Sequence, residues 1–486
     1  MPGRGTVGWP VVSLSDSQHA AVAALIDVPP VADELGRRFA AGGHQLHLVG
    51  GPVRDALLGR RSPDDLDFAT DARPERVLEL VDGWADATWT IGIAYGTVGV
   101  QRRGLRLEIT TYRADRYDRV SRNPAVEYGD SLEADLLRRD FTVNAMALSL
   151  PGHEFADPYG GLRDLHAKRL RTPATPEESF ADDPLRMLRA CRFVSQLELV
   201  PDPAVVEAMT AMAGQIERIT AERVQVEVSK LLLGAHPRRG LELLVGTGLA
   251  GYVLPELPAL RMEIDEHHQH KDVYAHTLTV LEQAIALESE PDLTLRMAAL
   301  LHDIGKPATR RMEPDGRVSF HHHEVVGAKM TRKRLRALAY PRDFTEHVAQ
   351  LVYLHLRFHG YGRGEWTDSA VRRYVTDAGP LLDRLHKLVR SDCTTRNRRR
   401  AQALSAAYDA LERRIAELRA REELDRIRPD LDGNEIMALL GIPPGPLVGR
   451  AYQHLLALRM ERGPLPHDEA VAELLTWARE HGVQGA

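Results

Sequence analysis

Beyond residue 44, hydrophobic and polar positions alternate in two different ways along the chain. Short runs rich in β-branched and aromatic residues, with apolar side chains at alternate positions, predict β-strands at 45–49, 65–69, 97–102, 105–112 and 143–148. Helical spacing at 74–81 and 132–139 separates some of these runs. The mixture predicts a small α/β or α+β domain in the first part of the chain.

From Pro173 onward the strand pattern nearly vanishes. Apolar residues recur at helical spacing through the remainder, most clearly at 185–197, 204–211 and 220–232. A longer helix is predicted over 401–420, and a short turn or hairpin at 312–318. The second part of the chain is therefore expected to be almost entirely helical.

Breaks in these patterns indicate domain boundaries. Prolines interrupt the helical spacing at 254–262, and a basic stretch at 396–400 opens the long helix. We predict an N-terminal tail with a lead-in helix, a sheet-containing head, a helical neck, a second helical domain and a helical tail, at 1–44, 45–172, 173–260, 261–395 and 396–486.

The composition changes this picture little. The 486 residues are 43% hydrophobic and 27% charged, which is typical of a globular protein of about two to four domains. Two cysteines are too few for a disulfide framework or a cysteine-built zinc site, and no run approaches the roughly 20 apolar residues that span a bilayer. We therefore expect a cytoplasmic protein that crosses no membrane, and we see no sign of an obligate protein partner.

The charge distribution leaves room for a nucleic-acid partner. A net charge of −6 argues against a protein that coats nucleic acid, although a local cationic groove stays possible on an acidic body. Arginines gather in three stretches, at 102–122, 186–192 and 396–400. For the last stretch a solvated helix face is the simpler interpretation.

The first chemical pattern is a glycine turn after the first predicted strand. Gly50 and Gly51 precede a proline and Arg54, so a strand is expected to lead through a tight turn into a helix. Paired glycines let a phosphate approach the backbone, and an arginine in the first helical turn adds a fork of donors. Taken alone, however, a glycine pair after a strand is more often a plain turn.

Acidic residues on the next strands make this turn more informative. Strand alternation places Asp65 and Asp67 on one face, with Leu66 and Phe68 pointing into a core. Glu108 is a third acid on a neighbouring predicted strand. Carboxylates that share a face repel one another unless a cation neutralises them, and Mg²⁺ bridging to nucleotide phosphates suits oxygen ligands. The pattern predicts metal-assisted phosphoryl transfer, with these three acids as the catalytic group.

Four ordered motifs carry a resemblance to a known family. They lie at 50–67, 108–113, 138–145 and 182–193, and the similarity spans about 45–235. Together they resemble the signature of CCA-adding tRNA nucleotidyltransferases and bacterial poly(A) polymerases, within the polymerase-β-like superfamily. The resemblance implies an α+β fold, in which a head with a mixed sheet and helices is followed by an all-α neck.

The resemblance also implies roles for individual residues. Gly50 and Gly51 would form the turn at which Gly51 and Arg54 hold the triphosphate, and Asp65 and Asp67 would bind Mg²⁺. Their substrates would be CTP, ATP and the 3′ end of a tRNA. The implied reaction is template-independent addition of CCA with release of diphosphate.

Further implied roles concern the sugar and the base. Arg139 with Asp140 would shape the sugar and phosphate site, while Asp183 with Arg186 would read the base and accept CTP and ATP but not GTP or UTP. Two arginines would add phosphate contacts, Arg189 and Arg192.

The residues around Asp183 also allow an interpretation without the family. Asp183, Arg186 and Arg189 recur at spacing three, so we expect them on one helix face. An acceptor beside a donor fork suits base recognition, whereas an isolated pair of this kind is more often a surface ion pair. One departure concerns the position before it, where Asp182 stands in place of the family's usual glutamate.

A second chemical pattern lies further along. His276, the pair His302 and Asp303, and Asp392 follow one another in the order that resembles HD-type phosphohydrolases. Two imidazoles and two carboxylates from separate helices can enclose a divalent or transition metal, whose identity the sequence does not fix. Two more histidines resemble the extra ligands of binuclear members, His323 and His355. The resemblance implies an all-α domain that acts on phosphorylated or cyclic RNA ends.

We therefore expect a CCA-adding nucleotidyltransferase with an HD phosphohydrolase domain behind it and a helical tail that helps to hold tRNA or caps the fold. A poly(A) polymerase, or an enzyme that adds only CC or only A, shares nearly every motif. An alternative of another class is an RNA-binding or signalling protein in which only the HD site is active.

Overall fold

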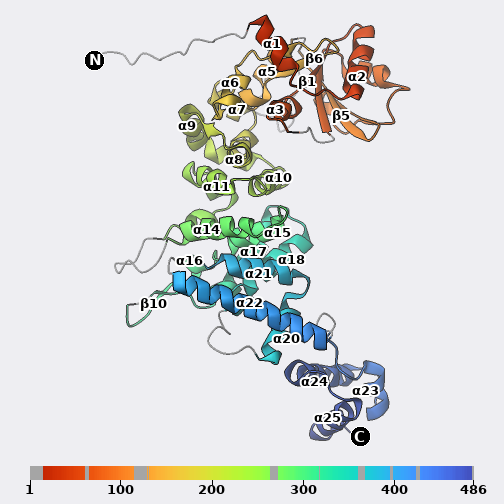
Figure 1. Ribbon diagram of the computed structural model, residues 1–486, viewed down its shortest axis with the longest axis vertical. Helices are drawn as coiled ribbons and strands as arrows, with labels where there is room; N and C mark the ends of the chain where they lie inside the picture. The colour runs from red at the N-terminus through yellow and green to blue at the C-terminus, as the bar shows by residue number, and fades with distance from the viewer. Residues whose placement is uncertain are drawn as a thin grey trace. The chain divides into compact units, whose positions relative to one another are not determined.

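The computed structural model divides the chain into two compact units, residues 1–253 and 254–486 (Figure 1). Residues are described over 15–60, 65–113, 128–129, 131–262, 272–316, 318–358, 367–393, 398–422 and 427–483. Parts of two arginine stretches, at 114–122 and 396–397, lie outside this set, as do residues 1–14 of the predicted N-terminal segment.

The first unit opens with a mixed seven-stranded sheet in the order β3-β4-β5-β2-β1-β6-β7. Its strands are β1 (Leu46–Val49), β2 (Asp65–Thr70), β3 (Ala87–Trp89), β4 (Thr97–Arg102), β5 (Leu105–Thr111), β6 (Ala147–Leu150) and β7 (Phe155–Ala156). Only β2 and β5 pair in parallel, and the other neighbours are antiparallel. The predicted α+β fold with a mixed sheet is confirmed.

Helices and turns connect and cover the strands. They are α1 (Asp16–Ala23), α2 (Pro30–Ala41), α3 (Gly51–Leu57), α4 (Pro74–Val81), η1 (Ile93–Tyr95), α5 (Leu132–Leu137), η2 (Thr142–Asn144) and α6 (Gly161–His166). Proline begins both α2 and α4, and the apolar faces of these two helices pack against each other and on the sheet. The sequence predicted one lead-in helix before the sheet, whereas the structure has two.

One predicted strand is misplaced. The run 143–148 was expected to be a strand, but η2 occupies its first residues and β6 begins at Ala147. Side chains from Thr142 to Leu148 are all buried, so the segment lacks the alternation that marks a strand with one exposed face. The turn directs Asn144 toward Arg54, which matters for the site described below.

The neck follows in the same unit and is helical, as predicted. Its helices are α7 (Pro176–Asp182), α8 (Leu185–Leu197), α9 (Pro203–Met212), η3 (Ala213–Arg218), α10 (Ala221–Leu232), α11 (Pro237–Gly246) and α12 (Ala250–Val253). A short parallel pair, β8 (Arg169–Leu170) with β9 (Val200–Pro201), lies at its start. Helix α8 packs on both α10 and α11, and its residues Leu188 and Phe193 are buried.

The second unit is also helical, apart from one hairpin. Its first part consists of α13 (Glu256–Ala259), α14 (Val273–Ala286), α15 (Leu293–Leu301), α16 (Lys306–Thr309), the hairpin β10 (Arg311–Met312) with β11 (Val318–Ser319), α17 (His323–Ala337), α18 (Arg342–Leu354), α20 (Asp368–Ala378), η4 (Gly379–Leu381) and α21 (Leu382–Ser391). Helix α15 packs against α14, α18 and α21, so it forms the centre of this bundle.

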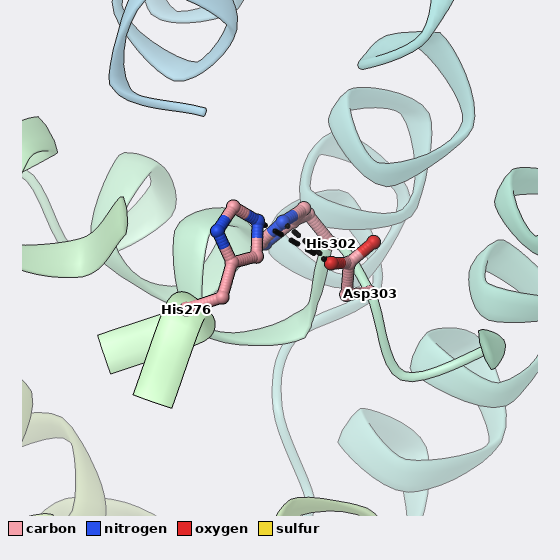
Figure 2. Close-up of side chains that lie close together, drawn as sticks. All are labelled: His276, His302 and Asp303. Atoms are coloured by element: carbon pink, nitrogen blue, oxygen red, sulfur yellow. Dashed lines mark ion pairs between the residues drawn. The ribbon is translucent and has the colours of Figure 1, made fainter. Parts of the chain in front are cut away.

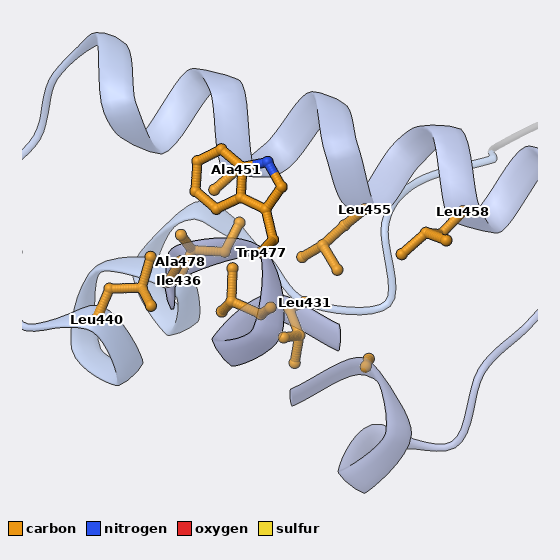
Figure 3. Packing of buried hydrophobic residues seen from close by; sticks show 10 residues of the cluster. Leu431, Ile436, Leu440, Ala451, Leu455, Leu458, Trp477 and Ala478 are labelled. Atoms are coloured by element: carbon orange, nitrogen blue, oxygen red, sulfur yellow. The ribbon is translucent and has the colours of Figure 1, made fainter. Parts of the chain in front are cut away.

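The chain ends in a long helix and a small bundle. These elements are α22 (Arg398–Arg421), α23 (Gly433–Leu440), α24 (Pro446–Arg462) and α25 (His467–Glu480). The last three helices enclose their own apolar core around Trp477, Leu455 and Ile436 (Figure 3). Within the described residues, no helix is both long and apolar enough to cross a lipid bilayer.

One buried arginine ties the terminal bundle to the rest of the second unit. Arg372 on α20 is 3% exposed and donates from Nε and Nη2 to both carboxylate oxygens of Glu422, over 3.0 and 2.8 Å. Its Nη1 also donates to the carbonyls of Met460 and Glu461 at the end of α24. The guanidinium thus links α20 to two other chain segments at once.

We predict that Arg372→Ala destabilises this junction by about 3–5 kcal/mol, because truncation leaves the Glu422 carboxylate buried and unpaired. The measurement is hydrogen exchange of α24 amides, which should accelerate relative to the wild type. Arg479→Ala is the matched control, since Arg479 is exposed and its hydrogen bonds to described residues stay within its own helix. Equal protection of α24 in the two variants would contradict the prediction.

Candidate active sites

The first candidate site is built on the turn between β1 and α3. Gly50 has φ +74° and ψ −129°, a conformation that favours glycine, and α3 begins at Gly51 with Pro52 in its first turn. A Cβ atom at Gly50 would lie 2.9 Å from Nη1 of Arg139. The turn therefore brings bare backbone next to a guanidinium, and both are groups that bind phosphate.

Arg54 is held firmly in the first turn of α3. Its Nε and Nη2 each donate to a carboxylate oxygen of Asp55 over 2.9 Å, and its Nη1 donates to Oδ1 of Asn144 over 2.6 Å. Its guanidinium carbon lies 5.3 Å from the centre of the Phe193 ring. These contacts fix the guanidinium and leave further N–H groups for a phosphate. The triphosphate role of Arg54 stays a prediction.

Asp65, Asp67 and Glu108 lie on one face of the sheet. Along β2 the two aspartates are exposed while Leu66 and Phe68 are buried, as the alternation predicted. Glu108 is exposed on β5 and pairs in register with Asp67 across the parallel ladder. The structure therefore brings the three predicted acids to adjacent positions.

The electrostatics of Asp67 reflect this crowding. Desolvation raises the pKa of its carboxyl group, and Glu108 and Asp65 raise it further, while Arg139 lowers it. A divalent cation relieves the repulsion between neighbouring carboxylates. Three carboxylates also supply the oxygen ligands that Mg²⁺ prefers. The residues thus fit the implied metal. In the part of the chain that the structure describes, the carboxylate oxygens of these three residues do not all lie within 4.8 Å of one another.

A chain of polar contacts joins the glycine turn to the neck. Asn144, which accepts from Arg54, donates from Nδ2 to Oδ1 of Asp140 over 3.0 Å. The other oxygen of Asp140 accepts from Nε of Arg189 over 2.7 Å, and Nη1 of Arg189 lies 3.8 Å from a carboxylate oxygen of Glu227 on α10. A continuous series of charged and polar side chains therefore links the head to the neck.

Burial tunes the charges in this chain. Burial alone would raise the pKa of Asp140, but Arg189 and Asn144 outweigh it and hold the pKa far below its usual value. Arg192 is 8% exposed, and its Nε lies 3.0 Å from Glu227. Burial and the charge of Arg189 lower the pKa of Arg192 to about 10. Arg192 thus lies inside the neck, and its phosphate contact stays a prediction.

The predicted helix face at the base-reading residues is partly wrong. Arg186 and Arg189 do lie on α8, but Asp183 follows the last residue of α7 in an extended conformation, with φ −138° and ψ 100°. Pro184 is the reason, because the residue before a proline is excluded from helical geometry. Asp183 therefore lies at the junction of two helices.

The side-chain partners of this pair were not predicted either. Within the described residues Asp183 makes its ion pair with Arg223 on α10, at 2.7 Å from Oδ2 to Nη2, and not with Arg186. Arg186 donates from Nη1 to the backbone oxygen and Oγ of Ser179, over 3.3 and 2.9 Å, and from Nη2 to the carbonyl of Arg138. The simple surface ion pair is therefore not formed.

The second candidate site is centred on Asp303, at the end of α15. Its Oδ2 lies 3.2 Å from Nε2 of His302 and 3.5 Å from Nε2 of His276, and its Oδ1 lies 3.3 Å from Nε2 of His323 and 3.9 Å from Nε2 of His355. Figure 2 shows the first two imidazoles converging on this carboxylate. Asp303 therefore belongs to two groups of side chains that could hold a metal ion, one on each of its oxygens.

Asp392 completes the first of these groups from α21. Its Oδ1 lies 3.0 Å from Nε2 of His276 and 3.7 Å from Nε2 of His302. All six residues predicted for the HD site are thus gathered in one place, although they come from α14, the end of α15, α17, α18 and the end of α21.

Backbone contacts orient three of the imidazoles. Nδ1 of His302, His323 and His355 lies 2.8, 2.9 and 2.6 Å from the carbonyls of Ala299, Phe320 and Val352. A ring that donates from Nδ1 has a free lone pair on Nε2, which is the metal-binding tautomer. The donor set fits a divalent or transition metal.

Burial and neighbouring charges shift the pKa values of residues in this site. Burial would raise the pKa of Asp303, but His302 and Lys306 outweigh it and hold the pKa well below its usual range. Burial would lower the pKa of His302, but Asp303 raises it above the usual value. Burial and the charge of His302 lower the pKa of His355 to about 3, so that ring stays neutral. The pattern keeps an ionised carboxylate among ligand imidazoles.

Sequence reasoning missed several residues that complete these sites. Lys306 lies 2.6 Å from Asp303. Its position three residues after Asp303 could have indicated this ion pair. Asn144 and Asp55 lie within the motifs at 138–145 and 50–67, but the sequence assigned them no role. Arg223 had no signal as a partner of Asp183, because the two are far apart in sequence.

Family comparisons cover most of the chain. The Poly A polymerase head domain matches residues 46–171, the probable RNA- and SrmB-binding site of polymerase A matches 199–260, and the HD domain matches 273–394. The matched segments contain every residue of the two sites except the base-reading region around Asp183 and the Arg189 segment.

Several relatives align with this chain over most of their own length. An A-adding tRNA nucleotidyltransferase from Deinococcus radiodurans is 35% identical, covering 89% of this chain and 95% of the relative. A CC-adding tRNA nucleotidyltransferase from Thermus thermophilus is 36% identical, with coverage of 88% and 93%. A CCA-adding enzyme from Anoxybacillus flavithermus is 30% identical, with coverage of 85% and 88%.

A solved structure agrees with these relatives. The crystal structure of the CCA-adding enzyme of Bacillus stearothermophilus in complex with CTP is 26% identical, covers 94% of this chain and 99% of its own, and superimposes with a TM-score of 0.69. The chain therefore belongs to the family of tRNA nucleotidyltransferases that includes the A-adding, CC-adding and CCA-adding enzymes.

Proposed function

We propose that the first unit adds CCA to the 3′ end of tRNA from CTP and ATP, with release of diphosphate. The observation that carries the proposal is the shared face of Asp65, Asp67 and Glu108 beside the turn at Gly50 and Arg139. The relatives named for CCA addition support it, as does the CTP complex of a similar structure. Action on tRNA also supports a cytoplasmic location.

The residues around the turn divide the work between substrate groups. The backbone at Gly51 and the guanidinium groups of Arg54 and Arg139 bind the triphosphate. Asp140 and Arg139 border the sugar. Mg²⁺ held by Asp65 and Asp67 would neutralise the phosphate charge that develops during transfer. Glu108 is placed in register with Asp67 to orient the attacking hydroxyl of the RNA.

Base selection follows from the acceptor and donor at the start of α8. Cytosine and adenine both present an exocyclic amino group, whereas uracil and guanine present a carbonyl oxygen at the equivalent position. The Asp183 carboxylate accepts from an amino group and repels a carbonyl oxygen, and Arg186 donates to the adjacent ring nitrogen. This pair therefore accepts CTP and ATP and rejects UTP and GTP.

Partial addition is the second candidate function, because the A-adding and CC-adding relatives match the chain at least as well as the CCA-adding one. A poly(A) polymerase is the third. The deciding experiment extends tRNA that lacks its last three nucleotides with CTP, with ATP and with both. Growth by CCA and no further supports the proposal, and growth by CC alone, by A alone or by a long A tract supports the corresponding alternative.

We predict that Asp67→Ala and Asp65→Ala reduce CTP incorporation by at least about 10³-fold, because each removes a ligand that stabilises transition-state charge. The measurement is single-turnover extension of the same tRNA. Asp71→Ala is a matched control just beyond the end of β2, and it should retain activity. Wild-type incorporation by Asp67→Ala would show that the metal assignment is wrong.

We further propose that the HD site hydrolyses phosphate esters at RNA ends. The supporting observation is the pair of ligand groups that share Asp303. Bound metal would supply an activated water for hydrolysis. His276 with Asp392 borders one side of the shared carboxylate and His323 with His355 the other, so the site can hold two cations.

Metal content tests this second activity directly. We predict that Asp303→Ala protein loses both bound metals, whereas His323→Ala loses one, because only the former removes a ligand common to both groups. The measurement is metal per chain by mass spectrometry after Mn²⁺ loading and desalting, together with hydrolysis of a 2′,3′-cyclic phosphate. His322→Ala is the control, since this histidine side chain is 83% exposed. Unchanged metal content in Asp303→Ala would exclude the shared site.

The alternative of another class, an RNA-binding or signalling protein with only the HD site active, has its own outcome. Such a protein would bind CTP and tRNA and hydrolyse the cyclic phosphate, yet it would extend no RNA. Incorporation that disappears in Asp67→Ala but survives in Asp303→Ala would exclude it.

A further inference from the structure

The residue that positions the base-reading carboxylate lies on a different helix from the carboxylate itself. Arg223 is in the first turn of α10, and its Nη2 lies 2.7 Å from Oδ2 of Asp183. The other carboxylate oxygen accepts the backbone N–H of Leu185 over 3.1 Å. Asp183 is thus held from two directions, by the start of α8 and by the neck.

This arrangement leaves a defined part of the carboxylate for a ligand. Each carboxylate oxygen has two lone-pair directions, and the contacts with Leu185 and Arg223 each use one. Asp183 is partly exposed, with 23% of its side chain accessible. An exocyclic amino group can therefore approach an acceptor whose orientation is already fixed, which is the condition for strong discrimination.

Within the described parts of the chain, Arg223 makes no second ion pair that would explain its place by packing. Half of its side chain is exposed, and its contact to Asp183 joins one nitrogen to one oxygen. Exposed ion pairs of this kind contribute about 0–1 kcal/mol to folding. The contact is too weak to hold the neck together, but its geometry is decisive for the orientation of one carboxylate.

We propose that Arg223 is a specificity-determining positioning residue, which acts through Asp183 to make the enzyme prefer bases with an exocyclic amino group. The proposal rests on the proposed base-reading role of Asp183. Without Arg223 the Asp183 side chain can rotate about its Cα–Cβ bond. Its carboxylate oxygen then no longer stays opposite the exocyclic amino group of the base. Discrimination between cytosine and uracil then falls.

The experiment measures kcat/KM for CTP and for UTP on tRNA lacking its last three nucleotides. The ratio of the two values is the readout, because the concentration of active enzyme cancels in it and a loss of folded protein does not move it. We expect Arg223→Ala to lower the ratio at least about tenfold, the range expected for a lost hydrogen bond to a charged group. Arg223→Lys should restore most of it, because the ammonium can reach one carboxylate oxygen.

The matched control is Arg239→Ala. Arg239 is on α11 of the same neck, is 56% exposed and pairs with Glu198 at 3.4 Å, so it is a comparably exposed neck arginine that does not contact Asp183. This variant should keep the wild-type ratio. The thermal midpoints of both alanine variants should stay within a few degrees of the wild type.

The outcomes separate the inference from the function on which it rests. If Asp183→Ala loses discrimination while Arg223→Ala keeps the wild-type ratio, Asp183 reads the base but Arg223 does not position it, and the inference is overturned. If Asp183→Ala also keeps the ratio, the base-reading assignment itself fails. A ratio that falls in Arg223→Ala and recovers in Arg223→Lys supports the inference.

Discussion

Carboxylates must be brought close together and kept ionised in both candidate sites, although they repel one another. In the head the parallel pairing of β2 with β5 sets Asp67 beside Glu108, and the nearby Arg139 offsets part of the charge. In the HD domain Asp303 is almost fully buried, and its charge survives because His302 and Lys306 surround it. The rest of each domain serves to hold these groups in place.

The two scaffolds meet this requirement differently. A sheet fixes neighbouring side chains through its register, so the head needs few extra contacts to align its acids. A helical bundle has no such register, and the HD site instead takes single residues from five helices or helix ends. Backbone carbonyls that orient the imidazoles of His302, His323 and His355 replace the precision that the sheet supplies.

Local patterns predicted the elements and the acids, whereas distant contacts could not be predicted. The bounds of β4 and α8 matched because alternation and helical spacing are properties of adjacent residues. The run at 143–148 failed because it is buried on all sides, and the expected helix face at Asp183 failed because Pro184 ends α7. The six HD residues were found by their order in the chain, but the sharing of Asp303 by two groups required the fold.

The polar chain from Arg54 through Asn144 and Asp140 to Arg189 and Glu227 has a consequence for how such proteins diverge. Asn144, Asp140 and Arg189 each contact a neighbour on both sides, so truncating one of them leaves its polar neighbours without a partner. Drift through this segment therefore has to proceed by paired replacements. A relative with a single unmatched replacement in this segment would have a weaker polar connection between its head and its neck.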